Sequence, residues 1–206
     1  MLLVLALLVG CAKSLPEDQT FPVYPVKPAA TTAVAVVDHR PYILIGEKEE
    51  WFEGHNRDTY GMPYSPERPG GRPFAIYLAD SLQQSLQSAG GEATVVKMAK
   101  GMSVEDAVAT MRRQGTDAGL LVLMDQSRYY IYLEKIDYAY RFDVLVLNRS
   151  GRTVARKVFE KVEEDIPPPG NYDHFDLTTW LYRRTFNRIL DDPEIKKALT
   201  DVAAGR

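Results

Sequence analysis

The run Ala118-Gly119-Leu120-Leu121-Val122-Leu123-Met124 decides the fold. Every residue in it is apolar, so both faces of the segment must be buried, as in a central strand that is covered on both sides. A second apolar run, from Ala33 to Val37, also has the length of a buried strand and stops just before Asp38. Two buried strands with helical segments between them predict an α/β domain built around a sheet.

The helical segments are indicated by their apolar period and by their ends. After Pro73, large apolar side chains recur at every fourth position: Phe74, Leu78, Leu82 and Leu86. Pro73 is a favourable first residue, and Gly90 ends the helix. Ser103 and Asp106 have the spacing of a capping box and predict a second helix. Asp173 is expected to cap a C-terminal helix, and Asp192-Pro193 to begin a short terminal one.

Residues 129–147 are strand-like throughout, with a bend expected near Glu134 to Asp137 because one strand of this length would be too long. Asn148 to Gly151 predicts a hairpin turn, after which Thr153 to Val162 returns antiparallel. The predicted fold class is therefore α/β (α+β): a mixed sheet of about five strands with helices packed on it, a long antiparallel hairpin and a C-terminal helix. Residues 33–206 would form one domain.

The N-terminal residues resemble a lipoprotein signal. Leu2 to Val9 is apolar but too short to cross a bilayer, which needs about 20 residues. Leu8-Val9-Gly10-Cys11 resembles a bacterial lipobox, and Cys11 is the only cysteine in the chain. The resemblance implies that residues 1–10 are a signal peptide and that Cys11 becomes the N-terminus and carries acyl chains such as palmitate. The alternative is a buried N-terminal strand that contains one cysteine.

The residue that follows Cys11 is Ala12 rather than Asp. By its similarity to the sorting pattern of enteric lipoproteins, this implies the periplasmic side of the outer membrane of a Gram-negative bacterium. Residues 11–32 contain prolines among small and polar residues, namely Pro16, Pro22, Pro25 and Pro28. This composition predicts an extended tether that would reach roughly 60 Å from the bilayer.

The composition excludes several classes of function. With Cys11 lipidated, no cysteine remains for a disulfide, so the exported domain must depend on its own core. A formal net charge of -3 argues against a general nucleic-acid binder, which would carry a basic face. The hydrophobic fraction of 45 % is ordinary for a globular domain.

The long connection at 39–72 has no clear period but is rich in aromatic residues: Tyr42, Trp51, Phe52, Tyr60 and Tyr64. A connection of this length in a compact domain is generally functional or disordered. Aromatic side chains are common at interface cores because they combine large buried area with few rotamers. These five residues are the candidate partner-binding site, and the alternative is that they fold back and cover the sheet.

Motifs of catalysis are absent from the sequence: it has no Gly-x-Ser-x-Gly elbow, no phosphate-binding loop and no dinucleotide fingerprint. Asp38, His39, His55 and Asp58 are suitable metal ligands by type, but no recognised spacing connects them. The glutamates of the long loop, including Glu53, are best explained as a solvated acidic segment. We therefore expect no catalytic residue, no metal and no cofactor.

Three segments resemble the small α/β domain of YajG-like, CsgG-like and TolB N-terminal envelope proteins. They are Val34 to Asp38, Ala79 to Gly91, and Gly115 to Leu123. The resemblance implies a non-enzymatic adaptor or assembly component that binds another envelope protein. The alternative is a module that binds peptidoglycan, another glycan or lipid through its tyrosines.

Overall fold

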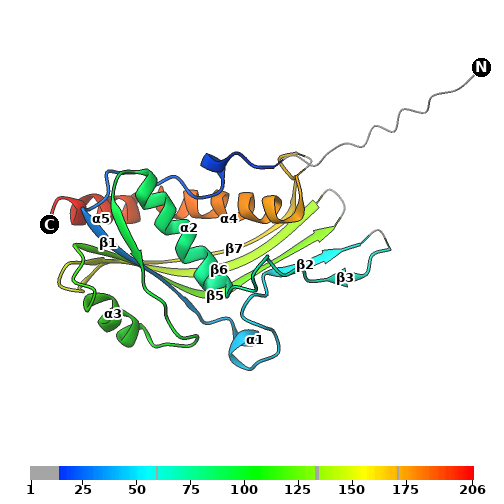
Figure 1. Ribbon diagram of the computed structural model, residues 1–206, viewed down its shortest axis with the longest axis horizontal. Coiled ribbons are helices and arrows are strands. Elements are labelled where there is room, and N and C mark those ends of the chain that lie inside the picture. Colours follow the sequence, from blue (N-terminus) through cyan, green and yellow to red (C-terminus); the bar gives the residue numbers. More distant parts are fainter. Residues whose placement is uncertain (1–13, 59, 133–134, 171) are drawn as a thin grey trace, which may run out of the picture.

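The computed structural model describes residues 14–58, 60–132, 135–170 and 172–206, and it has an α/β fold (Figure 1). Its strands form one mixed sheet: β1 (Thr31–Asp38), β2 (Gly54–Arg57), β3 (Pro63–Tyr64), β4 (Glu92–Val95), β5 (Ala118–Tyr132), β6 (Lys135–Asn148) and β7 (Thr153–Ile166). The α-helices are α1 (Pro41–Leu44), α2 (Phe74–Ser88), α3 (Val104–Arg112), α4 (His174–Leu190) and α5 (Pro193–Ala203). A 3₁₀ turn, Glu17–Gln19, precedes β1.

Strand β5 organises the sheet. Along one edge it pairs in parallel with β1 over Ala118–Met124 and then with β2 over Tyr129–Ile131. Along the other edge it pairs with β6 in antiparallel, and β7 follows β6. A bulge between Met124 and Gln126 lies between the segments paired with β1 and β2. The apolar run at 118–124 is buried at every residue, which confirms it as a central strand.

The two faces of the sheet are covered unequally. One face packs against α2, α4 and α5 and receives the side chains of Val34 and Val36. The other face receives those of Ala33, Ala35 and Val37, and α3 packs there. Figure 1 shows α2, α4 and α5 on one side and the shorter α3 on the other, near only one end of the sheet. Much of the second face is therefore left without a covering helix.

Most of the helix caps and turns that the sequence predicts are present in the structure. Ser103 Oγ accepts the Asp106 N–H at 3.1 Å, and Asp173 Oδ1 accepts the Asp176 N–H at 2.8 Å, so both predicted caps are present. In the turn between β6 and β7, Asn148 Oδ1 accepts the Arg152 N–H at 3.1 Å. The position predicted for the bend, near Glu134 to Asp137, is slightly too late in the chain, because β6 already begins at Lys135. Residues 133 and 134 are outside the described residues.

The extended conformation expected for the 11–32 tether is wrong over its described part. Leu15 and Tyr24 are each only 9 % exposed, and both lie against the folded domain. The Leu15 N–H donates to Asp176 Oδ2 at 2.9 Å, and the Val23 N–H donates to Asn187 Oδ1 at 2.7 Å. These contacts fasten the segment along α4. Isolated apolar residues between prolines are enough to hold it there, although they give no periodic signal.

Candidate functional site

The long loop begins with a buried ion pair. Arg40 is fully buried, and its Nε and Nη2 donate to the two carboxylate oxygens of Asp38 at 2.9 and 2.7 Å. The same guanidinium donates to the backbone carbonyls of Phe52 and Glu50. A bidentate, charge-assisted pair fixes both partners in one geometry. Arg40 therefore holds the far part of the loop against the end of β1.

A second ion pair closes the loop on itself. Arg68 Nε lies 2.6 Å from Glu53 Oε1, and the two side chains are 15 % and 4 % exposed. Tyr182 of α4 donates to Glu53 Oε2 at 2.9 Å, and Arg68 donates to Thr178 at 2.8 Å. The interpretation of Glu53 as part of a solvated acidic segment is thus wrong. Its carboxylate is buried because a cation and a hydroxyl satisfy it.

His174 links the loop to the first turn of α4. Its Nδ1 accepts from Asn56 Nδ2 at 2.7 Å, and its Nε2 lies 3.0 Å from the Tyr129 hydroxyl. Burial, together with the positive charge of Arg68, lowers the pKa of His174 to about 4. The imidazole is therefore neutral at pH 7 and bridges β2, β5 and α4. This bridge could not be predicted from the sequence, because its members lie far apart along the chain.

Beyond this base, β2 and β3 form a short antiparallel ribbon that extends from the body (Figure 1). Tyr60, Met62 and Tyr64 are 90 %, 65 % and 49 % exposed, and we call these three residues the ribbon tip. Asp58 Oδ1 accepts the N–H groups of Tyr60 and Met62 at 2.9 and 2.8 Å. The apolar side chains are thus presented on a turn whose own donors are satisfied.

The five aromatic candidates from the sequence do not form one site. Tyr60 and Tyr64 belong to the ribbon tip, Trp51 is half-buried, and Tyr42 is half-buried with its hydroxyl donating to Ser127 O at 3.0 Å. Phe52 as a partner-binding residue is a wrong prediction. It is 3 % exposed because its ring packs between Tyr42 and His55. Cys11 lies outside the described residues.

The uncovered part of the sheet carries exposed apolar and cationic side chains. Val158 and Val162 of β7 are 43 % and 68 % exposed, and β6 places Arg141 beside them. Arg128 and Tyr130 of β5 lie on the same side of the sheet by their register with β6. We call these five residues the open face. Arg57 lies 5.9 Å from the Tyr130 ring and 5.7 Å from the Tyr132 ring, at its border with the ribbon.

The described residues contain no group of three or more side chains that could hold a metal ion. Asp38, a predicted metal-type ligand, is instead paired with Arg40. Among the helices of the described chain, none combines the length and apolarity that crossing a membrane requires.

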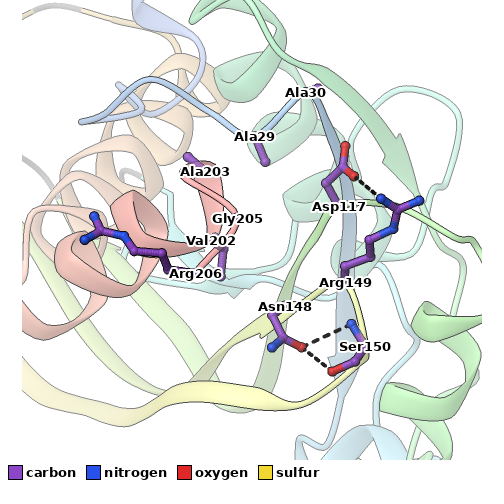
Figure 2. Close-up of a pocket in the computed structure, with 10 residues that line it drawn as sticks. All are labelled: Ala29, Ala30, Asp117, Asn148, Arg149, Ser150, Val202, Ala203, Gly205 and Arg206. Carbon is purple, nitrogen blue, oxygen red and sulfur yellow. Dashed lines mark hydrogen bonds and ion pairs between the residues drawn. The ribbon is translucent and has the colours of Figure 1, made fainter.

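The cavity in Figure 2, of about 520 Å³, lies between the end of α5 and the β6–β7 turn. Asp117 points toward Arg149 there and also accepts from Thr31 Oγ1 at 2.8 Å. Figure 1 places this region at the C-terminal end of the molecule, away from the ribbon. Its acidic group is already engaged by protein donors, so the cavity does not stand out as a ligand site.

No protein-family model matches the chain, and no curated protein sequence matches it. Solved structures that resemble it include the lipoprotein GNA1162 from Neisseria meningitidis, at 14 % identity and a TM-score of 0.39, covering 80 % of this chain and 100 % of that one. The hypothetical protein CT253 from Chlamydia trachomatis has 10 % identity, a TM-score of 0.44 and coverages of 86 % and 99 %. The LpoB C-terminal domain from Salmonella enterica has 12 % identity, a TM-score of 0.32 and coverages of 68 % and 88 %. Likenesses this distant carry no conclusion about function.

Proposed function

We propose that this chain is a non-enzymatic lipoprotein of the bacterial envelope, anchored through Cys11 on the periplasmic side of the outer membrane, whose open face binds another envelope protein. The single observation that carries the binding function is the exposure of Val158 and Val162 on the part of the sheet face that α3 and the other described helices leave uncovered. Exposed apolar side chains grouped on one surface are a common feature of protein interaction sites.

The composition of the open face suits a protein partner. Tyrosine and arginine are enriched in the centres of protein interfaces, and the open face contributes Arg128, Tyr130 and Arg141 beside its two valines. Arg141 is paired with Asp125 and Glu160, so its guanidinium is held in a defined position. A partner would therefore meet two exposed valines with the fixed Arg141–Glu160 ion pair between them.

The edge of β7 is a poorer binding surface than its face. A partner strand could pair with this edge, but exposed charged side chains lie along it: Arg156, Glu160, Lys161 and Glu164. Charges on an edge strand are a common protection against strand addition. We therefore place the partner on the face of the sheet.

The absence of catalysis is part of the proposal and is supported by how the buried charges are used. The carboxylates of Asp38 and Glu53 are both engaged by arginines, and His174 is neutral and held by two hydrogen bonds. Each of these groups stabilises the loop. None of them is free to act as a base toward a substrate.

Glycan binding is the second candidate, since exposed tyrosine rings can stack on sugars. The arrangement of Arg57 disfavours it on the open face, because the guanidinium lies over the rings of Tyr130 and Tyr132. A cation over an aromatic face is itself a stabilising contact that a sugar would have to displace.

The test is crosslinking in intact cells, followed by purification of the full-length lipidated protein and identification of what is attached. Val162→Asp places a charge on the most exposed apolar side chain of the open face, and Val23→Asp is the matched control because Val23 is 57 % exposed on another surface. We expect V162D to lower partner recovery about tenfold, equivalent to about 1.4 kcal/mol, and V23D to leave it unchanged. Equal recovery from both variants would show that the open face does not bind the partner. Recovery of the protein with nothing attached would favour the glycan-binding alternative, which is tested by binding to isolated peptidoglycan.

A further inference from the structure

The ribbon tip is an exposed apolar surface that the proposed protein-binding function does not use. Tyr60-Gly61-Met62-Pro63-Tyr64 contains no charged side chain, and Tyr60 is the most exposed of the large apolar or aromatic side chains described. Exposed apolar side chains that are grouped together, rather than scattered singly, mark protein- or membrane-contact sites. We propose that the ribbon tip lies in the interfacial layer of the bilayer to which Cys11 is anchored; this inference rests on the proposed lipid anchor.

The first support is position. Leu15, near the beginning of the described chain, is bound to Asp176 in the first turn of α4. His174 of the same turn is bonded to Asn56 of the ribbon, and Asn56 Nδ2 lies 3.4 Å from the Tyr64 hydroxyl. Figure 1 shows the start of α4 and the ribbon at the same end of the molecule. The anchored segment and the ribbon therefore emerge together.

The second support is reach. Leu15 is four positions after Cys11, and even a fully extended chain spans at most about 14 Å over four positions. Because Leu15 is fixed to the domain, the lipid cannot be much farther than this from the start of α4. The domain must then lie close to the bilayer, with its ribbon end facing the lipid.

The third support is chemistry. Tyrosine is enriched where membranes meet water, because its ring is apolar and its hydroxyl is polar. Backbone groups that enter a less polar layer need partners within the protein. The turn supplies them: Asp58 accepts the N–H groups of Tyr60 and Met62 through Oδ1 and that of Gly61 through its carbonyl, and its own N–H donates to Met62 O. Pro63 has no N–H to satisfy.

The experiment uses the full-length lipidated protein in vesicles of phosphatidylethanolamine and phosphatidylglycerol. Acylated Cys11 leaves no free thiol, so Met62→Cys provides one site for a nitroxide label while Tyr60 and Tyr64 are kept. Val162→Cys is the matched control, because its side chain is 68 % exposed, close to the 65 % of Met62. Collisions with oxygen, which partitions into lipid, are compared with collisions with a water-soluble nickel complex.

We expect the label at position 62 to show an oxygen-to-nickel collision ratio several-fold higher than the label at position 162. Equal ratios on protein that floats with the vesicles would overturn the inference and leave the lipid anchor intact. Protection of position 62 from both reagents would also overturn it, because the tip would then be covered by protein. Failure of the anchor is detected separately: the wild-type protein would take up the label at Cys11 and would not float.

Discussion

Glu53 and Arg68, fifteen residues apart, close the long loop through an ion pair at 2.6 Å whose side chains are almost removed from solvent. Arg68 also lies 3.9 Å from the ring of Tyr77, so the guanidinium is stacked as well as paired. This ion pair holds the long loop, which has no regular sequence pattern, in one position at the base of the ribbon. It thereby positions the ribbon and the border of the open face.

Removing one partner of this pair should destabilise the domain strongly. In Arg68→Met the Glu53 carboxylate stays buried without its cation, which costs about 3 kcal/mol of unfolding free energy. Denaturant unfolding followed by circular dichroism measures the change. Arg72→Met is the control, since the Arg72–Asp80 pair is at the surface and its loss should cost less than about 1 kcal/mol. Equal losses in the two variants would mean that the Glu53–Arg68 pair has no special structural role.

The stability of the domain should fall in mild acid because of His174. Its pKa is lowered to about 4 in the fold, so between this value and its ordinary pKa the unfolded chain binds a proton that the folded chain does not. The full contribution is therefore present above about pH 6.5 and is progressively lost as the pH falls toward 4. From pH 7 to pH 5 we expect a loss of about 2 kcal/mol from this group.

The measurement is the unfolding free energy at several pH values for the wild type and for His174→Gln. Because His55 also has a lowered pKa, owing mainly to burial, the difference between the two proteins isolates His174. The wild-type curve should fall more steeply than that of H174Q between pH 7 and pH 5. Parallel curves would show that the imidazole is not kept neutral by the fold.

Close approach of β2 to β5 depends on Gly54. A Cβ at this position would lie 2.3 Å from Tyr129 O and 2.7 Å from Tyr129 N. Gly54→Ala should therefore force the ribbon away from β5 at a cost of about 1–3 kcal/mol. Hydrogen exchange of residues 54–57 should accelerate, whereas Gly170→Ala, whose methyl meets only the Tyr172 ring edge at 3.3 Å, should leave it unchanged. Unaltered protection in G54A would contradict the observed strand pairing.

If Cys11 is lipidated, its substitution should change the cell fraction in which the protein is found. Cys11→Ser should move the protein from the membrane fraction to the soluble periplasmic fraction, because the tyrosines and methionine of the ribbon tip cannot replace several acyl chains. Ser14→Ala, three residues further on, should stay in the membrane fraction. Retention of C11S after a high-salt wash would reject the lipoprotein hypothesis.

The sequence predicted the parts of the fold that depend on local pattern. The period of Phe74, Leu78, Leu82 and Leu86 became the buried side of α2, and the caps at Ser103 and Asp173 formed as expected. Strand β5, however, continues past Met124 through Asp125 and Arg128, where the polar residues interrupt the apolar run. It continues because β6 and β2 pair with it there, which is a tertiary effect.

The candidate site was harder to predict from the sequence than the fold. The aromatic residues of the long loop were identified by composition, but burial of Phe52 and exposure of Tyr60 depend on where Arg40 and Arg68 hold the loop. Arg68 bonds to Thr178, more than a hundred positions away. The open face was missed for the same reason: Val158 and Val162 alternate like ordinary strand residues, and they are exposed because none of the described helices covers this part of the sheet.

The most direct test of the central claim is site-specific photocrosslinking in living cells from a photoreactive side chain placed at position 162 of the full-length protein. The same side chain at Gln87, exposed on α2 on the opposite side of the sheet, serves as the control. We expect one discrete crosslinked envelope protein from position 162 and none from position 87. Equal crosslinking from the two positions, or none from position 162 in protein that is correctly anchored, would contradict the claim that the open face binds a partner.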